Sequence, residues 1–80
     1  MEISAQTKVN DLLQAFPHLE GVLISLNPQF KKLRNPLLRN SVGRIATLKQ
    51  AALVADIPPL TFINHLRRAV GQDAMDEIAD

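Results

Sequence analysis

The chain has 80 residues, a formal net charge of +1, 46% hydrophobic residues and no cysteine. The lack of cysteine excludes disulfides, thiolate nucleophiles, iron–sulfur ligation and thiolate zinc sites, so packing within one small domain must provide the stability. With three Phe and no Tyr or Trp, stacking of single-stranded nucleic acid on aromatic side chains is not expected.

Residues 1–4, Met-Glu-Ile-Ser, have neither the basic flank nor the apolar run of a secretion signal. No apolar stretch approaches the ~20 residues that a membrane-spanning helix needs. We therefore expect a cytoplasmic protein without a membrane partner.

The first half of the chain predicts two amphipathic helices. Apolar residues recur at helical spacing at Val9, Leu12, Leu13 and Phe16. This spacing predicts a helix over residues 8–16, with Thr7 as its N-cap. The pattern restarts after Pro17 and predicts a second helix over residues 17–26. We interpret Gly21 inside that helix as the point of a close helix crossing.

Two Asn-Pro pairs follow, Asn27-Pro28 and Asn35-Pro36. Each pair predicts the start of a short helical turn, because Asn accepts hydrogen bonds from free backbone N–H groups and Pro presets φ at the first helical position. Gly43 is expected to loosen or end the second turn. The side chains expected to face inward are Phe30, Leu33, Leu37, Leu38, Val42 and Ile45.

Thr47 and Gln50 form a capping-box pair ahead of an Ala-rich helix predicted over residues 48–55. Pro58 and Pro59 end that element and begin a last helix, which Gly71 closes. The fold class is all-α: a compact orthogonal bundle of five or six short helices, against which residues 2–4 can lie extended. One helical domain is expected over 1–71, followed by a flexible acidic tail over 72–80.

The order of these motifs resembles a bacterial family. A Thr-x-Val-x-x-Leu-Leu helix, a Phe-Pro corner, the run Leu-Asn-Pro-x-Phe-Lys-x-Leu-x-Asn-Pro and an Ala-x-x-Ala helix are similar to domain of unknown function 1858 over residues 3–71. Related groups are the hybrid-cluster-protein-associated redox disulfide domain and the N-terminal domain of iron–sulfur cluster repair di-iron proteins. Those relatives carry cysteines just after the second helix, where this chain has Asn27-Pro28-Gln29-Phe30. The resemblance therefore implies the fold without the redox or iron chemistry.

Members of that family also occur fused to sensory or hemerythrin-like domains. The resemblance thus implies a small accessory module, not an enzyme, whose partner is another protein or a fused domain. No cofactor, metal or catalytic residue is implied. The two imidazoles, His18 and His65, are far apart in sequence and have no partner pattern, so we expect ordinary surface or capping roles for them.

Residues 21–55 contain no acid but several basic residues, which are Lys31, Lys32, Arg34, Arg39, Arg44 and Lys49. We interpret the Asn-Pro segment as a surface for a partner protein or an anion, because helix N-termini and cations both favour negative charge. The candidate residues are Asn27, Phe30, Lys31, Lys32, Arg34, Asn35, Arg39 and Arg44. The alternative is that the Asn side chains cap, the apolar side chains pack and the cations stay in water.

A second functional hypothesis is a helix-turn-helix-like DNA-binding domain over residues 47–68. Ala52, Ala55, Ile57, Thr61 and Phe62 fall at the core positions of such a unit. The contacts to DNA would come from Asn64, Arg67 and Arg68. Against this hypothesis, Asp56 stands where the turn glycine is usual, and the recognition helix would begin with Pro58-Pro59-Leu60.

Overall fold

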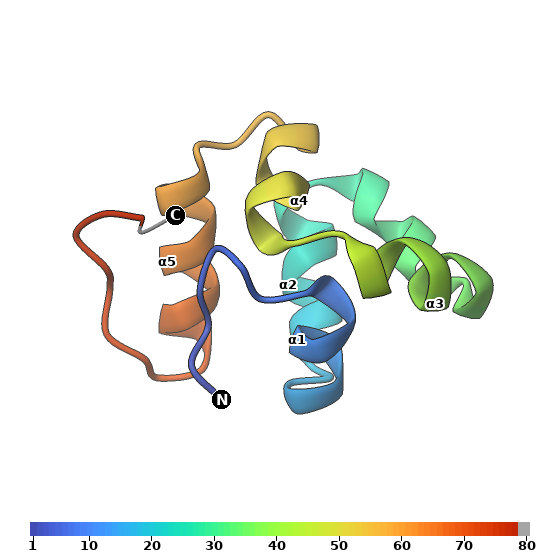
Figure 1. Cartoon of the computed structure of the whole chain (residues 1–80), viewed down its shortest axis with the longest axis horizontal. Helices are drawn as coiled ribbons and strands as arrows, with labels where there is room; N and C mark the ends of the chain where they lie inside the picture. Colours follow the sequence, from blue (N-terminus) through green and yellow to red (C-terminus); the bar gives the residue numbers. More distant parts are fainter. Residues whose placement is uncertain (79–80) are drawn as a thin grey trace.

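The computed structural model describes residues 1–78, over which the chain forms six helices and no strand (Figure 1). The helices are α1 (Val9–Ala15), α2 (Leu19–Leu26), the 3-10 helix η1 (Pro28–Arg34), α3 (Pro36–Ile45), α4 (Leu48–Val54) and α5 (Pro59–Ala69). They form a body of 34 × 22 × 21 Å. The predicted all-α fold is confirmed.

The helix starts depend on side-chain caps that the sequence predicted. Asn27 Oδ1 accepts from the N–H of Gln29 at 2.9 Å, and Asn35 Oδ1 accepts from the N–H of Leu37 at 3.0 Å. Before α4, the Gln50 N–H donates to the Thr47 hydroxyl while the Thr47 N–H donates to Gln50 Oε1, which completes the capping box. These local pairs explain why the three elements begin at these residues.

Thr7 is not the N-cap of α1. That position belongs to Lys8, whose side chain makes no cap hydrogen bond, and α1 begins at Val9. The Thr7 hydroxyl oxygen instead accepts from the Ser4 N–H at 3.0 Å. It therefore shapes the turn that leads into the helix.

Two helices end in the same hydrogen-bonded motif. After α4, Asp56 has φ +59°, and the N–H groups of Asp56 and Ile57 bond to the carbonyls of Leu53 and Ala52. After α5, Gly71 has φ +79° and the corresponding pair of hydrogen bonds is present, as the sequence predicted for this glycine. Both ends are Schellman motifs, which satisfy the last carbonyls of a helix through one left-handed residue.

The apolar core lies where α1, α2, α4 and α5 meet. Its large side chains with almost no exposed surface are Ile3, Leu12, Leu13, Leu19, Leu23, Leu48, Phe62, Ile63 and Leu66. Ile3 and Ala5 join the core from the N-terminal segment, which also accepts backbone hydrogen bonds from the start of α4. The predicted apolar stripes of α1, α2 and α5 therefore do face inward.

The predicted inward set of α3 is wrong. Leu37 and Ile45 are 79% and 74% exposed, and Val42 is exposed as well. Of the two outcomes expected for Gly43, loosening or ending the turn, the second does not occur, because α3 continues to Ile45. The apolar side chains of α3 are exposed because this helix packs on α1 and η1 near one end of the molecule and not on the central core (Figure 1).

The close helix crossing lies at Gly43 and not at Gly21. A Cβ atom on Gly43 would lie 3.5 Å from Asn10 Cβ of α1, whereas nothing lies within 4 Å of a Cβ atom placed on Gly21. Gly43 is buried. Because α3 contacts α1 through Gly43, which has no side chain, the larger apolar residues of α3 lie to the side of this contact.

The N-terminal residues and the start of the C-terminal segment lie together beside α5 (Figure 1). Arg67, which is 8% exposed, donates from Nη1 to the Ile3 carbonyl at 2.6 Å and from Nε to the Asp73 carbonyl. Gln72 accepts from the Ile3 N–H and donates to the Met1 carbonyl. The segment expected to be a flexible acidic tail is thus bonded to the fold near its beginning, while residues 79–80 lie outside the described residues.

Candidate docking site

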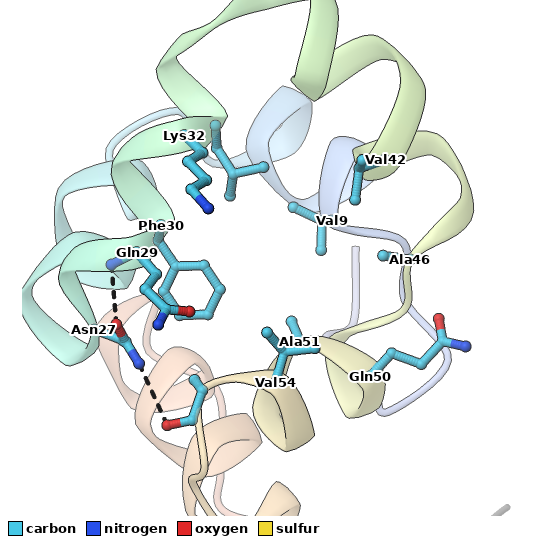
Figure 2. A pocket seen from close by; sticks show the side chains of 13 residues that line it. Val9, Asn27, Gln29, Phe30, Lys32, Val42, Ala46, Gln50, Ala51 and Val54 are labelled. Carbon is cyan, nitrogen blue, oxygen red and sulfur yellow. Dashed lines mark hydrogen bonds between the residues drawn. The ribbon is translucent and has the colours of Figure 1, made fainter.

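An apolar hollow of about 210 Å³ opens between η1, α3 and α4 (Figure 2). One wall consists of Asn27, Gln29 and Phe30, and the facing wall of Val42, Gly43 and Ala46. The α4 side completes it with Gln50, Ala51, Val54 and Ala55, while Val9, Lys32 and Leu33 also line it. We call this feature the η1–α4 hollow.

Phe30 is the largest side chain of the η1–α4 hollow. It is half-buried, and its ring lies 5.9 Å from the ring of Phe62, which belongs to the central core. Leu33, one turn further along η1, is buried. These contacts fix η1 to the core, so the Phe30 wall is a firm surface against which an apolar group can pack.

Asn27 holds η1 and α4 together at the edge of the hollow. Besides capping η1, it donates from Nδ2 to the Ala55 carbonyl at 3.4 Å (Figure 2). One side chain therefore both starts the 3-10 helix and connects it to the end of α4.

Exposed apolar side chains surround the opening. Val54, on the α4 side, is 74% exposed, and Val42, on the α3 side, is also exposed. Leu37 and Ile45 on α3 and Leu53 on α4 are exposed as well, although they do not line the hollow. Exposed apolar residues that gather around a hollow, as Val42 and Val54 do, are typical of interaction sites, whereas isolated ones are normal on any protein.

The cations predicted for this region are on the surface, but only Lys32 lines the hollow. Arg34 Nε lies 3.9 Å from Glu20 Oε1; Arg34 is exposed and Glu20 is half-buried, so water still screens this surface pair. Within residues 1–78, no ion pair involves Lys31, Lys32, Arg39 or Arg44. The positive charge of this face is thus largely uncompensated.

The structure divides the residues proposed from sequence into two groups. Asn27, Phe30 and Lys32 line the hollow, whereas Lys31, Arg34, Asn35, Arg39 and Arg44 do not. The N–H groups of Gln29 and Leu37, which an anion would use, are already bonded to the capping Asn side chains. This geometry favours an apolar contact over an anion cradle.

Sequence reasoning missed the wall that α4 contributes. The inward-facing stripe of α4 consists of Leu48, Ala51, Ala52 and Ala55, and Val54 lies outside it. An apolar residue outside the stripe could have indicated that α4 has a second apolar face. Val42 was noticed but was assigned to the core. That the two valines face the same hollow follows only from the fold.

Two of the three residues of the DNA-binding hypothesis, Asn64 and Arg67, have intramolecular partners. Asn64 donates to the Met75 carbonyl at 3.0 Å and accepts from the Met75 N–H at 2.7 Å. Arg67 is buried and bonded to the Ile3 and Asp73 carbonyls. Arg68 is exposed. The α4–α5 helix pair exists, but two of its three candidate base contacts hold the C-terminal segment.

Within the described residues, no group of three or more His, Cys, Asp or Glu side chains gathers in a way that could hold a metal ion. His18 and His65 are both exposed, and the His18 ring makes an edge-on contact with Phe16. None of the helices in residues 1–78 has the length and apolarity to span a bilayer.

The comparison with protein families gives a match over most of the chain. The chain matches the family described as Domain of unknown function (DUF1858) over residues 3–63. It belongs to this family. The match runs from the N-terminal segment into α5 and includes all elements of the η1–α4 hollow, so the hollow is part of the DUF1858 domain. Neither the comparison with curated proteins nor the comparison with solved structures finds a match.

Proposed function

We propose that this DUF1858 domain is a non-enzymatic, cytoplasmic interaction module that docks another protein or a fused domain at the η1–α4 hollow. The observation that carries the proposal is an open apolar hollow, with Phe30 as its wall, surrounded by apolar residues left in water on α3 and α4. Docking would remove this apolar surface from water, which is the main favourable contribution to most protein associations.

The size of the hollow supports a docked side chain over a bound cofactor. Ligand pockets for cofactors and drug-sized molecules measure about 300–1,000 Å³, and the hollow measures about 210 Å³. A cavity of ~150 Å³ accepts a benzene ring, so this volume suits one bulky side chain or two smaller ones. The exposed Ile45, about one turn after Val42 on α3, would then widen the contact area.

DNA binding by α4 and α5 is the competing proposal. In its favour, Arg68 is exposed and the two helices are paired. It requires Asn64 and Arg67 to leave their hydrogen bonds with the N- and C-terminal segments, and Arg67 to leave the interior. Because such exchanges leave buried carbonyls unpaired, docking at the hollow is the better-supported function.

The docking function is testable by site-specific photo-crosslinking. A photoreactive phenylalanine analogue is placed at Ile45 or, as a matched exposed control on the far side, at Ala69, and the tagged chain is exposed to an extract of its own cells. We expect a discrete adduct from position 45. An excess of unlabelled wild-type chain should reduce the yield of this adduct, whereas an excess of the unlabelled Val54→Asp variant should not. Absence of an adduct, or equal adducts from position 69, would contradict docking on this face.

DNA binding has a separate readout. Titration of labelled protein with short duplex DNA should leave the amide signals around Asn64, Arg67 and Arg68 unchanged if docking is the function. Shifts confined to those residues, with affinity that falls steeply with salt, would establish the DNA alternative.

A further inference from the structure

The charge around the η1–α4 hollow indicates what kind of partner segment it accepts. We infer that the hollow binds an acidic segment of a partner protein, one bulky aliphatic or aromatic side chain of which inserts between Phe30 and Val54 while flanking Asp or Glu side chains face the basic residues of η1 and α3. This inference rests on the proposed docking function and adds the chemistry of the partner.

The first argument is charge complementarity. Residues 21–55 supply η1, α3, α4 and most of the lining of the hollow, and this stretch contains no acid. Lys31, Lys32 and Arg44 are exposed and have no ion pair within residues 1–78. A basic partner would meet like charge here, whereas carboxylates would be attracted over about one Debye length, which is longer at low salt, and held at contact.

The second argument is the placement of one cation at the hollow itself. Lys32 lies on the lining, beside the same opening as Phe30 (Figure 2). An apolar side chain seated against Phe30 therefore places the neighbouring residues of its own chain next to an ammonium group. The recognised unit is a short one: an apolar anchor with a carboxylate close to it in sequence.

A second copy of this chain is a poor occupant. Two copies that meet symmetrically at this face would bring two identical basic surfaces together. A head-to-tail contact through the acidic residues Asp73, Asp76 and Glu77 is also disfavoured, because the apolar residues of that segment, Met75 and Ile78, pack against their own core. That segment thus has no free apolar anchor beside its carboxylates among the described residues.

The test uses a matched set of short synthetic peptides and the complete chain. The first peptide has a central Phe-Leu pair with Glu flanks; the second replaces Phe-Leu by Ala-Ala; the third keeps Phe-Leu but has Lys flanks. Binding is measured by fluorescence anisotropy at two salt concentrations, and the contact is mapped by amide chemical-shift changes. We expect the first peptide to bind at least roughly tenfold more tightly than either control, with shifts at Phe30, Lys32 and Val54.

Two pairs of variants separate the hollow from the general charge of the face. Lys32→Glu should weaken the first peptide more than Lys31→Glu does, although both change the net charge equally, because only Lys32 lines the hollow. Val54→Asp should abolish binding, whereas Leu53→Asp, at an exposed position that does not line the hollow, should weaken it less. All four residues are exposed, so the fold should persist, as the amide spectrum will check.

The outcomes distinguish this inference from the docking function. Crosslinking at position 45 without preference for the acidic peptide would leave docking in place and overturn the acidic-segment inference. Equal binding of the Glu- and Lys-flanked peptides, equal effects within each variant pair, or a self-association of the chain that covers Val54 would also overturn it. Failure of both crosslinking and peptide binding would remove the docking function itself.

Discussion

Asp56 occupies a backbone conformation that glycine adopts with less strain. Its φ of +59° lies in the left-handed region, and it ends α4 in the way that Gly71 ends α5. A side chain at this position crowds the following carbonyl, although Asp tolerates the conformation better than most residues do.

We therefore predict that Asp56→Gly raises the free energy of unfolding by about 0.5–1 kcal/mol. Asp56→Ala is the matched control; it keeps the Cβ atom and removes only the carboxylate, and it should give no such gain. Urea denaturation of the three proteins measures the effect. A lower stability for the Gly variant than for wild type would show that the carboxylate, and not the backbone, decides this turn.

At the scale of single residues, much was predictable because the interactions are local. Asn27, Asn35 and the Thr47–Gln50 pair bond to groups two or three positions away, so spacing in the sequence is enough to find them. The roles of Gly21 and Gly43 were not predictable in this way. Which glycine lies at a crossing depends on an element from another part of the chain, here Asn10 of α1.

Among the elements, α5 holds the N-terminal segment and the start of the C-terminal segment through Arg67. This guanidinium is buried, satisfies the carbonyls of Ile3 and Asp73, and lies 3.5 Å from Glu2 Oε1. A buried arginine with these partners cannot be removed without leaving carbonyl groups unpaired.

We predict that Arg67→Leu lowers the free energy of unfolding by about 2–4 kcal/mol. It should also speed hydrogen exchange at the Ile3 amide, which bonds to Gln72. The control is Arg68→Leu, one residue along and exposed, whose effect should stay within about 0.5 kcal/mol. Similar losses for the two variants would contradict the assignment of Arg67 as a structural clamp.

The existence and order of the helices could be predicted, because apolar spacing, prolines and caps mark each one. The orientation of α3 could not. The spacing of its apolar residues is the same whether that side of the helix faces the core or water. The contact of Gly43 with α1 sets the orientation, and it leaves the apolar side in water. The same contact places Val42 opposite Val54 and creates the candidate site, so the site was only partly visible in the sequence.

In the molecule as a whole, the apolar residues divide between a buried core and an exposed face. Leu33 is 9% exposed and Leu37 is 79% exposed, although both were expected to face inward. Truncating a buried leucine to alanine lowers the free energy of unfolding because it leaves a cavity in the packed core. Truncating an exposed leucine leaves no cavity.

We predict that Leu33→Ala lowers the free energy of unfolding by about 2–4 kcal/mol, while Leu37→Ala changes it by no more than about 0.5 kcal/mol. Thermal and urea denaturation both report the difference. Comparable losses for the two variants would mean that α3 turns its apolar side inward, and the hollow would then not exist in this form.

Gln72 bonds to both Met1 and Ile3 beside the end of α5, and the following residues run back along α5, where Met75 bonds to Asn64. The hollow belongs to the elements next to α3, at the other end of the longest axis (Figure 1). Both ends of the described chain lie in the α5 half of the molecule (Figure 1), so a domain fused at either end would leave the far end unobstructed. The η1–α4 hollow would then stay open to solvent on the outer side of the fusion.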